Sequence, residues 1–230
     1  MDIEGCFLPE DRLYDLDAGV WLKTEGEADA ALGLMASFAS FVGRVLAVTY
    51  RPPGILIDRG RSVAMLESLR FTGPVRTPVP GTVTDQNPAL RSTPKLINNA
   101  PYDQGWIVRL RLAEPGGTSP TLEPAAAVEP RLREQIRAQR IRCFPAVADG
   151  ELIEIGAECA AILARLDEEL APRAPGDVLL LVTDDPTSPI EMVRWSDRTG
   201  NEVLHHRTEG NLHQFLVRRA REPKDRSTGR

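Results

Sequence analysis

The sequence predicts two domains, an all-β domain followed by an α+β domain built as a two-layer sandwich. Residues 1–112 contain short apolar or alternating runs that Gly, Pro and Asn residues separate, as in small β folds. Residues 113–130 are rich in Pro, Ala and Gly and contain no aromatic residue. From residue 150 onward, strand and helix patterns alternate. The 230 residues suffice for two domains of about 100 residues each.

The first domain, residues 1–112, is expected to form a small sandwich or flattened barrel. Its expected strands are the runs GVWLKT, ADAALGL, GRVLAVTY, SVAMLESL, GPVRTPVPG and GWIVRLRL. One helix is expected over residues 35–43, where Met35, Phe38 and Phe41 are spaced to share one face.

Residues 113–150 are predicted to connect the domains as a Pro/Ala linker followed by a basic helix. The linker, residues 113–130, has no apolar period, and its prolines favour an extended chain. The segment 131–142 holds good helix formers with Leu132 and Ile136 four residues apart. Its arginines form either a solvated helix face or a docking surface for an acidic partner.

The second domain, residues 151–220, is predicted to contain strands and helices in the order βαβαββ. The run 152–155 alternates as a strand does, and residues 159–171 repeat their apolar positions with a helical period. A continuous apolar strand covers 177–183, and an acidic, Pro-containing start introduces a helix that ends at Gly200. Two alternating strands close the domain, and residues 221–230 are expected to be a disordered tail.

Charge and hydropathy exclude several classes of function. The net charge is −5 and the pI is about 5.4, which argues against a nucleic-acid-binding protein, because phosphate binding requires a basic face. There is neither a run of 18 apolar residues nor a signal-like start, so no membrane association is expected. Three widely spaced cysteines, Cys6, Cys143 and Cys159, do not suggest a disulfide framework. The expected location is the reducing cytoplasm, with any functional cysteine acting as a thiolate.

Three stretches of the first domain carry a family likeness. They are residues 20–48, residues 64–90, and residues 94–112, which read PKLINNAPYDQGWIVRLRL. These stretches resemble the H protein of the glycine cleavage system, and the last one is the most specific. The resemblance implies a lipoyl-type fold, the barrel-sandwich hybrid.

The resemblance also implies a modified lysine, which this chain lacks. In the H-protein family a hairpin reads Glu-Ser-Val-Lys-Ala, and the lysine amine is acylated by lipoate. Here the hairpin reads Glu67, Ser68, Leu69 and then Arg70. A guanidinium group stays protonated and is a poor acyl acceptor, so lipoate is predicted to be absent and glycine-cleavage activity is not expected. Arg70 is then either a solvated turn residue or a charged tip that binds a carboxylate, phosphate or partner surface.

The second domain resembles the TusA-like (SirA-like) sulfur carriers over residues 151–219. The family signature is Leu-Asp-x-x-Gly-x-x-Cys-Pro-x-Pro, followed by a helix and Pro-Gly-Asp. The matching residues here are Leu152, Gly156, Cys159, Pro175, Gly176 and Asp177, with further matches at Asp185, Pro186, Trp195 and Gly200. The resemblance implies that Cys159 accepts a sulfane sulfur as a persulfide.

The expected position of Cys159 suits this chemistry. It lies where a strand turns into a helix, and thiolates are favoured at the positive helix N-terminus, with a pKa below that of a free cysteine. The chain departs from the signature at Ile153, Ala160 and Ile162, and Glu158 opposes thiolate formation. The alternative is that Cys159 is a small apolar residue in a degenerate scaffold.

Other candidate residues carry weaker signals. Cys143, between Arg142 and Phe144, is either an ordinary buried cysteine or a relay partner for Cys159, and Cys6 lies in an acidic N-terminus expected to be loose. His205 and His206 fall on opposite faces of a strand, so at most one of them can join His213. No metal site is expected.

Together these features favour a sulfur carrier or sulfurtransferase component in which Cys159 holds a transient persulfide. The H-like domain would then dock to partners, which are sulfur-transfer or lipoyl-dependent proteins. The resemblance supports this, since H-like proteins and TusA-like carriers are associated in bacterial sulfur-oxidation systems. The alternative is a non-catalytic adaptor or regulator with two degenerate domains.

Overall fold

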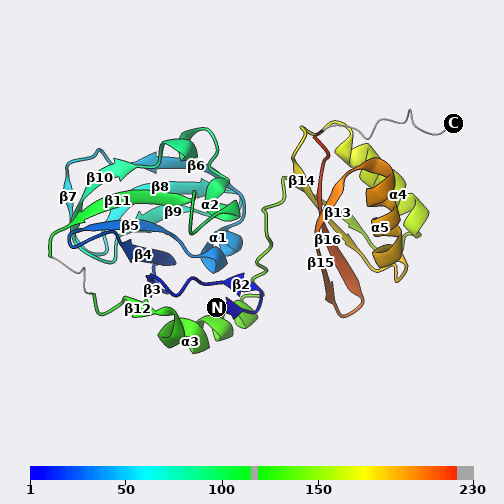
Figure 1. The fold of residues 1–230 in the computed structure, drawn as a ribbon. Helices are drawn as coiled ribbons and strands as arrows, with labels where there is room; N and C mark the ends of the chain where they lie inside the picture. The colour runs from blue at the N-terminus through cyan, green and yellow to red at the C-terminus, as the bar shows by residue number, and fades with distance from the viewer. Residues whose placement is uncertain (115–118, 222–230) are drawn as a thin grey trace. The chain divides into compact units, whose positions relative to one another are not determined.

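The computed structural model describes residues 1–114 and 119–221. The chain divides into two compact units, Met1–Phe144 and Pro145–Arg230 (Figure 1). The tail expected over residues 221–230 lies, apart from its first residue, outside the described residues. No helix in the described part of the chain is long and apolar enough to cross a membrane.

The first unit is β-rich, as predicted, with short helices at its edges (Figure 1). Its strands are β1 (Asp2–Ile3), β2 (Cys6–Phe7), β3 (Leu13–Asp15), β4 (Val20–Thr24), β5 (Asp29–Leu34), β6 (Val45–Tyr50), β7 (Leu56–Ile57), β8 (Ser62–Ser68), β9 (Thr72–Arg76), β10 (Gly81–Gln86), β11 (Trp106–Leu112) and β12 (Glu123–Pro124). Its helices are α1 (Ala36–Val42), the 3-10 helix η1 (Pro88–Arg91), α2 (Leu96–Asn99) and α3 (Ala125–Ala138).

Two sheets enclose the main core of this unit. The larger sheet has the order β12-β3-β4-β5-β11-β10-β7, and the smaller one has the order β6-β8-β9. Alternating residues of both sheets point inward, among them Leu32, Leu66 and Leu110, which are almost completely buried. The β-rich fold class and the helix near residues 35–43 are therefore confirmed. The strands β3 and β10, the two-residue strands and the short helices η1 and α2 were not predicted.

The boundary between the units lies later than predicted. The linker expected over 113–130 is wrong from residue 125 onward, because α3 begins at Ala125 rather than at residue 131. Ala is the best helix former, so the run AAAVEP extends the helix toward its N-terminus. Val128, Leu132 and Ile136, at intervals of four, are buried in a second core of the first unit.

The arginines of α3 are paired within the first unit. Arg133 and Arg137 both bind Glu4, at 3.0 Å and 2.7 Å, and Arg133 also binds Glu129. Arg131 contacts Glu123 of β12. For these three arginines, glutamates of the same unit therefore take the place of the acidic docking partner that the sequence left open.

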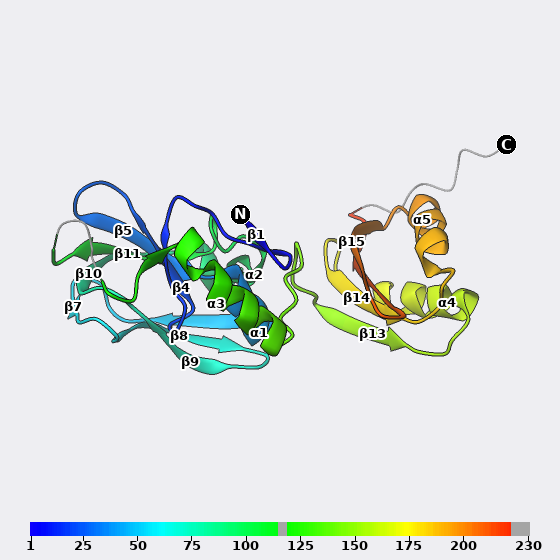
Figure 2. The same cartoon turned by 90° about the horizontal axis from the view of Figure 1, so that it is seen from below.

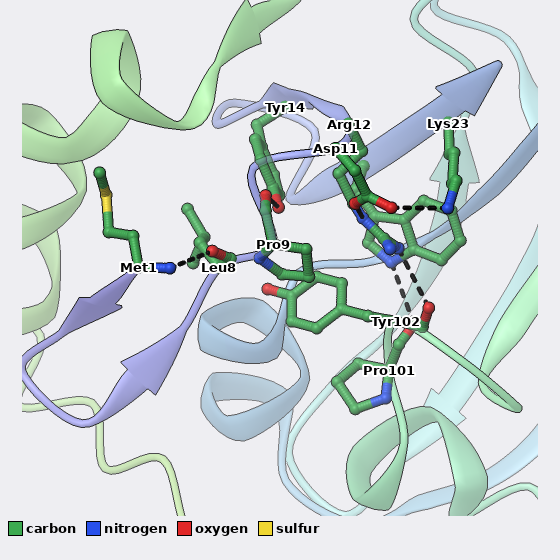
Figure 3. A network of polar contacts seen from close by, with 10 residues as sticks. Met1, Leu8, Pro9, Asp11, Arg12, Tyr14, Lys23, Pro101 and Tyr102 are labelled. Carbon is green, nitrogen blue, oxygen red and sulfur yellow. Dashed lines mark hydrogen bonds and ion pairs between the residues drawn. The ribbon is translucent and has the colours of Figure 1, made fainter.

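The N-terminus is ordered, contrary to the expectation of a loose segment. Ile3, Cys6 and Leu8 are completely buried in the second core, beside α3. The Met1 amino group donates to the Leu8 carbonyl at 2.9 Å, which closes the β1–β2 hairpin (Figure 3). Burial of these apolar side chains, at roughly 25 cal/mol per Å², explains why an acidic segment is still held in place.

Arg12 anchors the next part of this segment (Figure 3). Its guanidinium lies 4.6 Å from the Trp21 ring centroid and 5.2 Å from that of Tyr102, and it donates to the Tyr102 carbonyl at 3.1 Å. Asp11 binds Lys23 and Arg12, and these hydrogen bonds lower the pKa of Asp11 to about 2. The stability that this carboxylate contributes is therefore present above the usual Asp pKa and is lost as the pH falls toward 2.

Replacing Arg12 by Ala is expected to lower the free energy of unfolding of the first unit by about 2–3 kcal/mol. The substitution removes a desolvated cation–π contact and leaves the Tyr102 carbonyl without this donor. Urea unfolding checks the result, and Arg131→Ala, at an exposed ion pair, serves as a control expected to change stability by less than about 1 kcal/mol. Equal midpoints for Arg12→Ala and wild type would contradict the anchoring role.

The second unit has the predicted βαβαββ order (Figure 2). Its elements are β13 (Gly150–Glu154), α4 (Cys159–Leu170), β14 (Val178–Thr183), α5 (Ser188–Thr199), β15 (Glu202–Glu209) and β16 (Leu212–Arg218). The sheet order is β13-β14-β16-β15, with β13 and β14 parallel and the remaining neighbours antiparallel. Both helices lie on the same face of this sheet (Figures 1 and 2), which confirms the α+β two-layer sandwich.

The core of the second unit lies between the helices and the sheet. Ile162, Leu166 and Leu170 of α4 are buried there, at the helical spacing seen in the sequence. Trp195 of α5 is also buried, and its indole N–H donates to Asp167 of α4 at 2.8 Å. As predicted, α5 ends at Gly200, whose φ of 80° is left-handed and suits glycine.

Candidate functional site

Cys159 is the first residue of α4, directly after the loop that leaves β13. It is partly buried, and it is the free cysteine among the residues that the structure describes. Glu158 is the N-cap residue, and its side chain makes no capping hydrogen bond. The Cys159 amide is engaged by Asp185, and the Ala161 amide donates to the Glu158 carbonyl at 3.0 Å, so this end of α4 acts on an anion at the cysteine sulfur mainly through the helix dipole.

The loop that leads from β14 into α5 encloses the other side of this cysteine. The backbone N–H of Gly156 donates to Asp184 at 2.7 Å, and the backbone N–H of Cys159 donates to the Asp185 carboxylate. Asp185 also accepts from the N–H and the hydroxyl of Thr187, each at 2.7 Å. These bonds join the two loops, so that the N-terminal ends of α4 and α5 meet at Cys159.

The electrostatic surroundings of Cys159 differ from the prediction. Burial raises the pKa of the thiol, and the carboxylates of Asp185 and Glu191 raise it further, while the hydroxyls of Thr187 and Ser188 oppose the shift. The expectation of a pKa below that of a free cysteine is therefore wrong. Desolvation of the sulfur is the largest cause of this shift, and the two carboxylates come from the α5 side.

The departures from the sulfur-carrier signature have local structural explanations. Ile162, at the position of the second signature proline, is completely buried in the core of the unit. Ala160 is exposed, and α4 begins at Cys159 without either proline. Ile153 stands where the signature has its aspartate. It is 62% exposed on β13, so this position lies outside the buried core. Cys159 thus keeps its place at the helix start without the two prolines and the aspartate of the signature.

Cys143 is not a thiol in this structure but forms a disulfide with Cys6. Their Cα atoms are 5.1 Å apart, although 137 positions separate them in the sequence. The β1–β2 hairpin and the end of α3 share one apolar core, and this packing brings the two sulfurs together. The expectation of unpaired cysteines is wrong for this pair, and the disulfide leaves Cys143 no thiol with which to relay sulfur.

Of the two adjacent histidines on β15, His206 is the one that lies beside His213, and strand alternation predicted that at most one of them could do so. His206 Nε2 lies 3.1 Å from His213 Nδ1 on the neighbouring strand, and the His206 ring stacks on Phe215 at 4.3 Å. Burial lowers the pKa of His206. Within the described ranges, no group of three or more His, Cys, Asp or Glu side chains is arranged to hold a metal ion.

The hairpin at which the H-protein resemblance predicts the lipoylation position is formed by β8 and β9. Its tip is tied to the end of α1: Leu69 N–H donates to Arg44 O at 3.1 Å, and Arg70 N–H donates to Val42 O at 3.3 Å. Ser68 is buried, and its hydroxyl is 2.8 Å from Val42 O. The backbone of the tip is thereby held in place, while the side chains of Leu69 and Arg70 remain exposed.

The residues of this hairpin do not fit a lipoyl group. Acylation requires a nucleophilic amine, and the exposed side chain at the modification position is the guanidinium of Arg70. Glu67, also exposed, supplies a carboxylate and no amine. The aliphatic part of Arg70 lies beside Gly43, whose φ of 77° requires glycine at the end of α1.

Sequence reasoning missed three residues of the Cys159 site: Asp185, Thr187 and Ser188. In the sequence, Asp185 matches the sulfur-carrier family, and the two hydroxyl residues fall within the start of a predicted helix. The available signal was an acidic, hydroxyl-rich loop directly after a buried strand. In a βαβ unit such a loop lies at the same sheet edge as the preceding strand–helix turn.

Two family models match the chain, one for each unit. The model for "Glycine cleavage H-protein" matches residues 12–134, and the model for "Sulfurtransferase TusA" matches residues 154–219. The first match continues well into α3, in agreement with the packing of that helix on the first unit.

Curated relatives match the first unit over nearly their whole length. Glycine cleavage system H protein 5 of Aquifex aeolicus is 34% identical over 146 residues, which are 62% of this chain and 98% of that protein. A probable glycine cleavage system H protein 2 of Sulfolobus acidocaldarius is 33% identical over 141 residues, with 60% and 94% covered. The crystal structure of an H protein from Mycobacterium marinum matches with a TM-score of 0.48 and 21% identity, covering 54% of this chain and 98% of that one.

Proposed function

The chain belongs to the glycine cleavage H-protein family and carries a TusA domain after the H-protein domain, and we propose that it works as a sulfur carrier whose Cys159 holds a persulfide. The observation that carries this proposal is the position of Cys159. It is the free cysteine of the described residues, and it lies where two helix N-termini meet in the TusA domain. Partial burial protects a bound sulfur from solvent while leaving a path for a partner.

The proposed reaction transfers one sulfane sulfur without net oxidation. The Cys159 thiolate attacks the outer sulfur of a donor persulfide, R–S–SH, and a new S–S bond forms on Cys159. The S–S bond of the donor breaks, and R–S⁻ leaves with its electron pair. Thiosulfate reacts in the same way and releases sulfite. Attack by an acceptor thiolate on the outer sulfur reverses the process and regenerates Cys159.

Intact-protein mass spectrometry of the full chain tests this function. The disulfide-bonded protein is exposed to thiosulfate or to a low-molecular-weight persulfide, so that Cys6 and Cys143 remain blocked. Wild type is expected to gain the mass of one sulfur, which a reductant removes, and Cys159→Ala is expected to gain none. Cys143→Ala, which unblocks Cys6, controls for the first unit and should still load Cys159.

A wild-type protein that gains no sulfur from either donor would contradict the carrier function. Sulfur that persists in Cys159→Ala would assign the chemistry to another residue. The same spectra also report on the relay role considered for Cys143, since loading of Cys159 without Cys143 shows that no relay is needed.

The H-protein domain is proposed to dock the carrier to its partners, which are sulfur-transfer or lipoyl-dependent proteins. The alternative function, a non-catalytic adaptor, is favoured by exposed apolar side chains on this domain. Leu69 at the hairpin tip is 67% exposed, and Phe41 on α1 is 44% exposed. Because the hairpin tip is tied to the end of α1, these side chains lie on connected segments. Undiminished partner binding by Cys159→Ala, together with no sulfur loading by wild type, would favour the adaptor.

A further inference from the structure

We propose that the Ser188 hydroxyl is a hydrogen-bond donor to the sulfur anion of Cys159, holding first the thiolate and then the persulfide at the N-terminus of α5. This inference deepens the proposed carrier function and rests on it. It assigns a role in sulfur binding to the first residue of a helix other than the one that carries the cysteine.

Burial of Ser188 is the first observation. The residue is 1% exposed, and its hydroxyl makes no hydrogen bond within the part of the chain that the structure describes. A buried hydroxyl without a partner typically costs about 1–3 kcal/mol, so such groups are rare in folded proteins. This hydroxyl belongs to the first residue of α5, and it is one of the groups that lower the pKa of the Cys159 thiol.

A count of hydroxyl hydrogens distinguishes Ser188 from Thr187. Both hydroxyls lie near the Cys159 sulfur. The Thr187 hydroxyl donates to Asp185 Oδ1 at 2.7 Å, and a hydroxyl has a single hydrogen to donate. The Thr187 hydroxyl can therefore donate to the sulfur only when its hydrogen leaves Asp185. Ser188 keeps its hydrogen for the sulfur, and donation of that hydrogen favours the anion.

The charges around the site explain why such a donor is needed. Asp185 and Glu191 disfavour a negative sulfur, and burial adds to their effect. Arg194 binds Glu191 at 2.6 Å and offsets part of that charge, while Asp185 is held by Thr187 and by the Cys159 amide. A hydrogen bond to a charged group is among the stronger ones in proteins, so a donor aimed at the sulfur recovers part of the lost stabilisation.

The experiment compares Ser188→Ala and Ser188→Thr with wild type in the full chain. The rate of Cys159 alkylation by iodoacetamide is measured as a function of pH, and sulfur loading is followed by intact mass. Ser188→Ala is expected to raise the pH midpoint of alkylation by about one unit and to slow loading at pH 7 about tenfold. Ser188→Thr, which keeps a hydroxyl, should restore most of both.

Ser196→Ala is the matched control on the same helix. The Ser196 hydroxyl donates to the Asn201 carbonyl at 2.6 Å, near the C-terminal end of α5, so its loss should leave the alkylation profile unchanged. Ser188→Ala removes a hydroxyl without a conventional partner, and it should therefore not lower the unfolding midpoint. A lowered midpoint would show that the hydroxyl serves the fold and would overturn the assignment.

The readouts separate this inference from the carrier function. If wild type and Ser188→Ala load sulfur at the same rate and share one alkylation profile, the role of Ser188 is wrong and the carrier function stands. If wild type does not load, the carrier function fails. The alkylation profiles then still decide whether Ser188 stabilises the thiolate.

Discussion

Breaking the Cys6–Cys143 disulfide is expected to lower the free energy of unfolding of the first unit by about 2–5 kcal/mol. The bond closes a loop across a separation of 137 residues, and the entropy that it removes from the unfolded chain grows with loop length. It also joins the N-terminal hairpin to the end of α3, whose apolar side chains form one core.

Hydrogen exchange of the β5 and β11 amides measures this effect, because these strands lie at the centre of the larger sheet. Wild type is compared with and without a thiol reductant, and the double variant Cys6→Ala/Cys143→Ala is treated in the same way. The reductant should accelerate exchange in wild type and leave the double variant unchanged. Cys159→Ala should respond as wild type does. Identical exchange in oxidised and reduced wild type would contradict the stabilising role.

Substituting Arg70 by Lys is expected to convert the first unit from a protein that takes no lipoate into one that does. The hairpin keeps Glu67 and Ser68 of the H-protein pattern, and the position at its tip is exposed. A lysine amine can lose its proton and be acylated, whereas a guanidinium group cannot. The tip backbone, bonded to Val42 and Arg44, does not depend on the side chain at this position.

Intact mass after incubation with a lipoate–protein ligase, lipoate and ATP checks this prediction. Wild type should gain no lipoyl group and Arg70→Lys should gain one. Arg59→Lys, at an exposed turn before β8, is the matched control and should remain unmodified. If Arg70→Lys also stays unmodified, the arginine is not what prevents lipoylation, and the hairpin itself has lost its recognition by the ligase.

The order and type of most elements could be predicted from local patterns. The period of Ile162, Leu166 and Leu170 gave α4, and the continuous apolar run before Asp184 gave β14. The start of α3 could not be placed, because Pro, Ala and Glu in residues 124–130 suit an extended linker as well as a helix. Packing of Val128 on the first unit decides between them, and amino-acid composition alone does not predict this contact.

The sequence alone determined the chemistry that the chain can offer: a cysteine at a strand–helix turn, and an arginine where an H protein has its lysine. Both follow from residue identity and from spacing along the chain. Only the tertiary structure decided which cysteines are paired and what surrounds Cys159. Cys6 and Cys143 meet through a shared core, and Asp185 and Ser188, from the α5 side, act on the Cys159 thiol. Such contacts depend on long-range packing, and so do the burial and the charges that raise the pKa of Cys159.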